Sequence, residues 1–179
     1  MSETLRPYEI ITDFATGRDI PLIGPEENRQ RVERFLVETK GYAREDIEID
    51  VDLALNIGGE RWQSQVDLVL SVDDTRAIAF KCVAASIGSR EREIVSAARL
   101  LDEYQIPFAV VSDGENAIVL DTISGKKIGL GLAAIPTRTE LQNKLRSMEP
   151  QPFPEEKRDR EKLVFRTYDM ENVKVSRFL

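Results

Sequence analysis

Two short stretches, Gln65-Val-Asp-Leu-Val-Leu70 and Arg76-Ala-Ile-Ala-Phe-Lys-Cys-Val83, decide the fold of this chain. Each alternates apolar residues with polar or small ones, which is the pattern of a half-buried strand. Asp73-Asp74 between them favours a turn, so the two strands are predicted to form a hairpin. Asp67 and Lys81 both point away from the apolar face, where they could share one cleft. The alternative is an ordinary cross-strand ion pair, worth about 0.2–1 kcal/mol.

The flanking sequence extends this hairpin into a larger sheet. Alternation from Ile47 to Leu55 predicts a preceding strand, and Gly58-Gly59 turns the chain into the hairpin. Pro25 and Gly41 bound a predicted helix over about 25–40. A second helix is predicted from Ser89, as N-cap, to about Gln105, followed by strands at 108–112 and 117–120. Because this helix crosses over between the third and fourth strands, those two strands are predicted to be parallel.

The C-terminal part is predicted to be less regular. Thr137 and Glu140 form a capping-box pattern that opens a short helix to about Ser147. The prolines at 150–154 and the charged run at 155–162 indicate an exposed linker, and residues 163–179 show no clear period. We therefore expect one domain over 1–149 with a linker and tail over 150–179.

Composition excludes several kinds of chemistry. The 179 residues contain no histidine and one cysteine, Cys82, which rules out histidine triads, imidazole zinc sites and disulfides within the chain. Catalysis would have to use carboxylates, lysine, tyrosine or a hard metal held by oxygen. A polar, acidic N-terminus and the absence of a run of about 20 apolar residues predict a cytoplasmic protein with no membrane partner. The net charge of −7 argues against a general nucleic-acid coat.

In these motifs the chain resembles the PD-(D/E)XK nuclease superfamily, in particular the N-terminal domain of type I restriction enzyme R subunits and its stand-alone relatives. The hairpin stretches 65–70 and 77–81 carry the resemblance over roughly residues 8–125. Three further segments support it: Ile11 to Ile20 with Pro25 to Arg31, Gly41 to Glu48, and Ile106 to Gly114. The resemblance implies an α/β fold with a restriction-endonuclease-like mixed sheet flanked by helices: a three-strand meander, a crossover helix and two further strands.

The resemblance also implies a hydrolase site, from which this chain departs at one position. In that family an Asp and a second acid bind Mg²⁺, and a Lys two residues after the second acid helps the attacking water. Asp67 and Lys81 match, but Ala79 stands where the second acid belongs. Glu93, on the predicted second helix, lies at the margin of the apolar stripe and could lean towards Lys81 as a replacement metal ligand. The alternative is that Glu93, like Glu91, only favours the helix N-terminus.

Other candidates are weaker. Glu27 and Glu48 could supply an acid, although a first helical turn or a strand's solvent face explains them as well. Trp62 could be core or a base-stacking platform. DNA contacts could come from arginines of the two helices, which otherwise are solvated surface: Arg29, Arg31, Arg34, Arg90, Arg92 and Arg99.

Three functions remain open from the sequence. The first is a catalytically degenerate nuclease-fold domain with a DNA-binding or restriction-related role. The second is an active Mg²⁺-dependent endonuclease in which Asp67 and Glu93 bind the metal and act with Lys81. The third is a protein-interaction domain without a nucleic-acid role. The sequence contains no phosphate-binding loop for ATP, so ATP-driven movement would require another subunit of a restriction system. Oligomeric state is not encoded in any motif.

Overall fold

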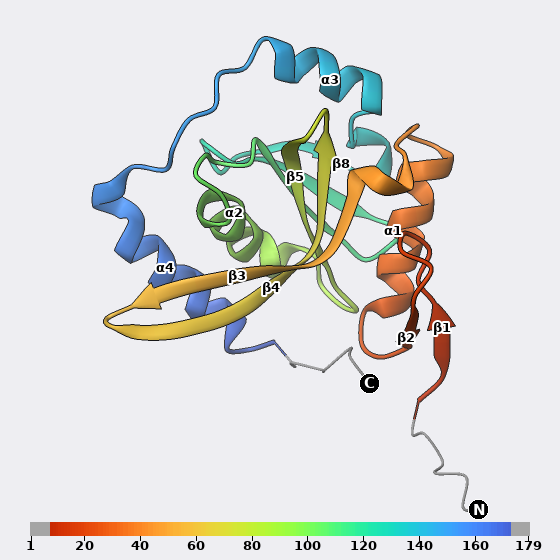
Figure 1. The fold of residues 1–179 in the computed structure, drawn as a ribbon, viewed down its shortest axis with the longest axis horizontal. Coiled ribbons are helices and arrows are strands. Elements are labelled where there is room, and N and C mark those ends of the chain that lie inside the picture. The colour runs from red at the N-terminus through yellow and green to blue at the C-terminus, as the bar shows by residue number, and fades with distance from the viewer. Residues whose placement is uncertain (1–7, 173–179) are drawn as a thin grey trace, which may run out of the picture.

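A computed structural model describes residues 8–172 as a six-stranded mixed sheet covered by helices on both faces (Figure 1). The helices of the described chain are α1 (Glu26–Glu38), α2 (Glu91–Leu100), α3 (Arg138–Arg146) and α4 (Glu155–Asp169). Its main-sheet strands are β3 (Ile47–Ile57), β4 (Glu60–Val72), β5 (Thr75–Cys82), β6 (Phe108–Ser112), β7 (Ala117–Asp121) and β8 (Lys127–Leu130). A separate small hairpin joins β1 (Ile10–Thr12) to β2 (Asp19–Pro21).

The strand order is β3-β4-β5-β6-β7-β8, with β5 and β6 parallel and all other neighbours antiparallel. This confirms the three-strand meander, the helical crossover and the parallel pairing predicted from the sequence. The small hairpin and β8 were not predicted, because short strands of three or four residues carry little periodicity.

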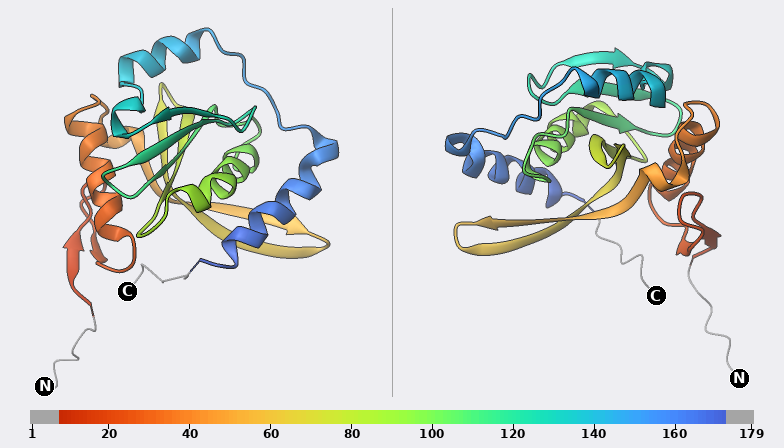
Figure 2. Two further views of the ribbon diagram at one scale, coloured as in Figure 1. Left: turned by 180° about the vertical axis from the view of Figure 1, so that it is seen from behind. Right: turned by 45° about the horizontal axis from the view of Figure 1, so that its top comes forward.

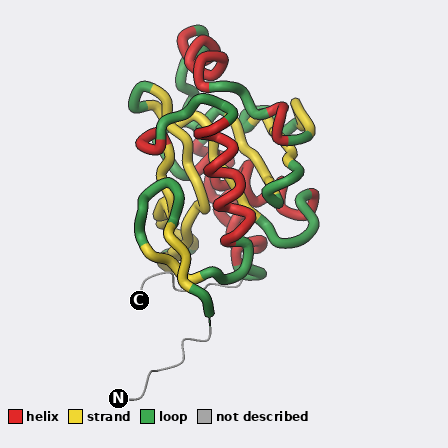
Figure 3. The backbone as a smooth tube through the Cα atoms, turned by 90° about the vertical axis from the view of Figure 1, so that its right-hand side faces the viewer, coloured by secondary structure: helices red, strands yellow, loops and turns green. Residues whose placement is uncertain are grey.

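The sheet separates two hydrophobic cores. One core packs α2 and Phe165 of α4 against one face, while the other packs Val32 and Leu36 of α1 and Leu141 of α3 against the opposite face. Figure 2 shows α1 and α2 on opposite sides of the central strands, and Figure 3 shows the helices from the side of the sheet. Strands β5, β6 and β7 are therefore buried along most of their length, whereas β8 and the outer part of the β3–β4 hairpin are more exposed.

Strand β3 changes sides at Asp50, which the simple alternation did not predict. Ile47 belongs to the core on the α1 face, whereas Leu53 and Leu55 belong to the core on the α2 face. Asp50 has a positive φ of 50°, a conformation that kinks a strand and interrupts its pleat. Beyond the kink, the β3–β4 hairpin extends away from the sheet and lies alongside α4 (Figure 2).

The second helix begins and ends differently from the prediction. Arg90 occupies the N-cap position, and the Ser89 hydroxyl donates to the Ser86 carbonyl instead of capping α2. The helix stops at Leu100, and the Ile106 N–H returns to the Ala98 carbonyl. The predicted extension to Gln105 is wrong because the chain turns back here to enter β6.

The predicted linker is also wrong, because residues 155–169 form α4. This helix packs against α2 and buries Phe165 in the core. Its apolar pattern is sparse, so its position depends on buried carboxylates, described below. The capping box of Thr137 and Glu140 is confirmed at the start of α3. Residues 173–179 of the predicted tail lie outside the described residues.

Candidate functional site

Asp67 and Lys81 meet near the end of the central hairpin. Asp67 lies near the middle of β4, and Lys81 is the penultimate residue of β5. Asp67 Oδ2 accepts a 2.8 Å hydrogen bond from the Cys82 backbone N–H, which ties the carboxylate to the end of β5. Lys81 Nζ lies 3.9 Å from the same oxygen. The predicted cross-strand pair is therefore present, but as a buried feature and not as a surface ion pair.

Glu93 completes the group from the first turn of α2. Its Oε1 lies 3.3 Å from Lys81 Nζ, and its side chain is 4% exposed. The prediction that Glu93 leans over the sheet towards Lys81 is confirmed as a matter of position. Lys81 thus lies within ion-pair distance of two carboxylates, one from a strand and one from a helix. We call Asp67, Lys81 and Glu93 the Lys81 site.

The lysine of this site is protonated. Burial lowers its pKa, but the nearby carboxylates of Asp67 and Glu93 outweigh burial and raise the pKa above its ordinary value. Lys81 can therefore donate hydrogen bonds and neutralise an anion at neutral pH, but it is not available as a general base.

Further groups hold Glu93 in place. Arg90 Nη1 lies 3.3 Å from Glu93 Oε2, and the Asn172 side-chain amide donates a 2.6 Å hydrogen bond to Glu93 Oε1. Asn172 follows α4 in the sequence, so the segment predicted to be a tail reaches the site. Asn172 was not predicted as a site residue, and Arg90 was predicted only as a possible DNA contact. Arg90 stood among the basic residues of the sequence, while no sequence signal marked Asn172.

A pocket of about 520 Å³ opens beside the Lys81 site. Asp67, Lys81 and Arg90 line its charged part. The end of β2, the loop before α1 and the loop after β5 supply an apolar wall that includes Pro21, Ile23 and Val83. Charged groups of opposite sign in such a pocket are costly to bury and are common at functional sites. The Lys81 site is therefore the strongest candidate site in the described chain.

The side chains of the Lys81 site can be compared with the oxygen ligands that a hard cation such as Mg²⁺ requires. Across residues 8–172, no three His, Cys, Asp or Glu side chains gather in a group suited to a metal ion. Ala79 is fully buried in the core and offers no side-chain oxygen. The site thus supplies two carboxylates, from Asp67 and Glu93. Two carboxylates fit Mg²⁺, which commonly keeps several waters and completes its shell with substrate phosphates.

The other predicted candidates lie elsewhere. Glu27 pairs with exposed Arg31, and Glu48 pairs with Arg76, so neither joins the site. Trp62 packs against the core and donates its indole N–H to Asp169, 2.8 Å away, which makes the indole a structural contact.

The arginines proposed for DNA contact are already paired with acidic or aromatic groups. Arg29 is completely buried, so the suggestion that it lies on the surface is wrong. Arg34 stacks on the Phe14 ring. Arg92 and Arg99 both bind Glu161 of α4.

Fold and site together define a mixed α/β domain whose central strands present a carboxylate–lysine pair to a pocket, with a second carboxylate delivered by the crossover helix. Residues 24–136, more than half of the chain, match the family described as the type I restriction enzyme R protein N terminus, and the chain belongs to this family. No curated protein and no solved structure matches the chain. None of the described helices is long and apolar enough to cross a membrane.

Proposed function

We propose that this domain has a restriction-endonuclease-like fold and hydrolyses DNA with a divalent metal, using Glu93 in place of the acid missing at position 79. The observation that carries the proposal is the 3.3 Å approach of buried Glu93 to Lys81, on the same side as Asp67. A helix that merely favoured acids at its N-terminus would leave Glu93 in solvent, as acids in first turns usually are. Membership of the R-protein N-terminal family supports DNA as the substrate class.

In this proposal, Asp67 and Glu93 would hold Mg²⁺. The bound metal would polarise the scissile phosphate and lower the pKa of a water molecule. Asp67 is oriented for this role by the backbone N–H of Cys82. Protonated Lys81 would bind a phosphate oxygen or orient the attacking water, and it would neutralise charge as that charge develops.

A second candidate is a domain that binds DNA in a restriction system without cleaving it. The observation favouring it is that Glu93 is already engaged through both oxygens, by Lys81, Asn172 and Arg90, while Ala79 supplies no ligand. A cation would have to compete with these donors for the carboxylate.

A cleavage assay on plasmid and linear duplex DNA separates the two candidates. The full chain is incubated with Mg²⁺, Mn²⁺ or a chelator, beside the variants Asp67→Asn and Glu93→Gln. The matched control is Glu91→Gln, which removes one charge from the same helical turn, where Glu91 pairs with Lys127. We expect cleavage that requires metal and falls by about 100-fold or more in both site variants. Glu91→Gln should retain it.

Two results would overturn the proposal. Equal cleavage by Glu93→Gln and the wild-type chain removes Glu93 from the chemistry. Metal-independent DNA binding with no cleavage under any condition establishes the second candidate instead.

A further inference from the structure

Helix α4 lies beside α2 (Figure 1). Its Glu161 carboxylate is bound by several side chains of α2. Arg92 donates to both oxygens of Glu161 at 2.9 and 3.0 Å, and Arg99 Nη1 lies 3.2 Å away. The Ser96 hydroxyl donates a further 2.7 Å hydrogen bond. A carboxylate gripped by two guanidinium groups occupies the same positions that a phosphate oxygen would take.

The C-terminal end of α4 then reaches the Lys81 site. Arg90 Nη1 donates to the Tyr168 carbonyl at 3.2 Å and lies 3.6 Å from Glu171 Oε2. Asn172 holds Glu93. Asp169 fixes this end to the β3–β4 hairpin, since it accepts hydrogen bonds from Trp62 and Ser64. One continuous segment therefore contacts three arginines of the α2 region and the Glu93 carboxylate of the site.

The attachment of α4 is mostly polar. Among its residues, all of which the structure describes, Phe165 is the one apolar side chain that is fully buried. Leu163 of α4 is 45% exposed, and Met170, which directly follows the helix, is 67% exposed. When this helix lifts, the hydrophobic burial lost from its own side chains is chiefly that of Phe165. A polyanion can compete for the same guanidinium groups.

We infer that α4 and residues 170–172 form a displaceable acidic strap, and that the partner which displaces it is the phosphate backbone of DNA. The strap neutralises Arg90, Arg92 and Arg99 in the free protein and covers Glu93. DNA phosphates replace Glu161 and Glu171 on these arginines, which uncovers Glu93. The inference rests on the proposed function for its substrate, and it adds control of access to the same site.

The test compares two charge-matched variants of the full chain. Glu161→Gln weakens the grip of Arg92 and Arg99, while Glu156→Gln removes an equal charge from an exposed position of the same helix. Binding of a short duplex DNA is measured by fluorescence anisotropy at low and moderate salt, and hydrogen exchange of 155–169 is followed with and without DNA. Thermal melting checks that both variants fold.

We expect Glu161→Gln to bind DNA about tenfold more tightly than Glu156→Gln, because less free energy is spent on opening the strap. Hydrogen exchange in α4 should rise when DNA binds to the wild-type chain. Equal affinity of the two variants, or an α4 that stays protected while DNA is bound, overturns the inference. So does a complete absence of DNA binding by Glu161→Gln. If Glu161→Gln does not fold, the wild-type exchange measurement alone decides.

The result of the binding and hydrogen-exchange test is independent of the result of the cleavage assay. If DNA opens α4 but no metal supports cleavage, the strap stands and the proposed hydrolysis falls. If the chain cleaves DNA through Asp67 and Glu93 while α4 stays protected, hydrolysis stands and the strap falls.

Discussion

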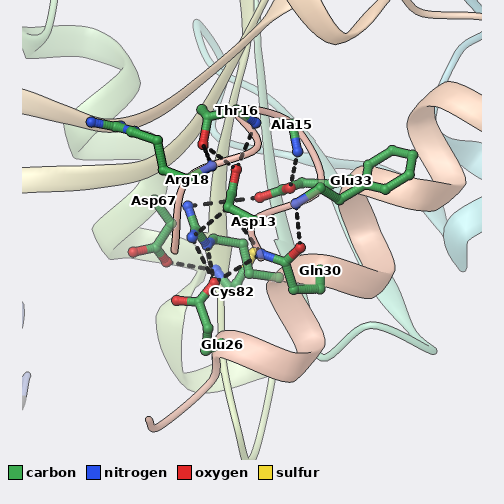
Figure 4. Close-up of polar contacts among 11 residues, drawn as sticks. Asp13, Ala15, Thr16, Arg18, Glu26, Gln30, Glu33, Asp67 and Cys82 are labelled. Carbon is green, nitrogen blue, oxygen red and sulfur yellow. Dashed lines mark hydrogen bonds and ion pairs between the residues drawn. The ribbon is translucent and has the colours of Figure 1, made fainter. Parts of the chain in front are cut away.

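Two cations in this domain, Arg29 and Lys81, each lie among carboxylates, and they differ in their access to solvent. In the Arg29 cluster, Arg29 lies 2.6 Å from Glu26, 3.0 Å from Asp13 and 3.7 Å from Glu33, with all of these side chains at most 1% exposed. In the Lys81 site, the cation is 16% exposed and faces a pocket. Asp67 and Cys82 lie beside residues of the Arg29 cluster (Figure 4), so the two are neighbours.

The sealed cluster holds the N-terminal segment onto α1. Asp13 accepts from Arg29 and Gln30, the Phe14 N–H donates to Gln30, and the Ala15 N–H donates to Glu33. The charged side chains of this cluster are at most 1% exposed, which leaves no approach for a ligand. The Lys81 site has the same kind of charges, but its cation can reach a molecule in the pocket. Access, and not charge, makes the Lys81 site the candidate functional site.

Removal of Arg29 should cause the largest loss of stability among the variants of these two regions. Arg29→Met leaves Asp13, Glu26 and Glu33 buried without their cation, which should cost about 3–5 kcal/mol of unfolding free energy. Arg31→Met is the control, since Arg31 forms exposed pairs and should change stability by less than about 0.5 kcal/mol. Urea denaturation measures both. A loss below about 1 kcal/mol for Arg29→Met would show that the cluster is not a stabilising anchor.

The pH dependence of stability tests the same cluster. Burial, opposed by Arg29, raises the pKa of Glu33 to about 7. An acid with a raised folded-state pKa stabilises the fold below its unfolded value of 4.5, and this contribution is lost as pH rises through about 7. The unfolding free energy should therefore fall by about 2 kcal/mol between about pH 5 and pH 8. Denaturation of wild type and Glu33→Gln over this range measures the slope, which the variant should lack.

Lys81→Met should reduce DNA cleavage strongly and stability only slightly, in contrast to the large stability loss expected for Arg29→Met. Glu93 keeps Arg90 and Asn172, and Asp67 keeps the Cys82 N–H, so the unfolding free energy should fall by only about 1–2 kcal/mol. Metal-dependent DNA cleavage should fall by about 100-fold or more, because the pocket loses its protonated lysine. A stability loss as large as that of Arg29→Met would place Lys81 with the structural cluster.

Local patterns explain which of these features the sequence predicts. The hairpin of Asp67 and Lys81 can be predicted from the alternation of apolar residues and from the turn residues. The position of Glu93 on the helical wheel of α2 is enough to predict that it faces Lys81. Burial of Arg29 was not predicted, because its partner Asp13 lies 16 positions away and a helical arginine resembles a solvated one. Helix α4 was missed for a similar reason, since Glu161 and Asp169 anchor it in place of an apolar stripe.

The smallest predicted loss of stability concerns a hydrogen bond that links α1, which carries Arg29, to the chain beside the Lys81 site. The Asn28 side-chain amide, on α1, donates a 2.8 Å hydrogen bond to the carbonyl of Val83, which lines the pocket just after Lys81. Asn28→Ala should cost about 1 kcal/mol of unfolding free energy, because this hydrogen bond is lost. If α1 positions the end of β5, cleavage by the variant should also fall, with a larger change in kcat than in KM. Unchanged kinetics beside the same loss of stability would show that the Lys81 site keeps its geometry independently of the Arg29 cluster.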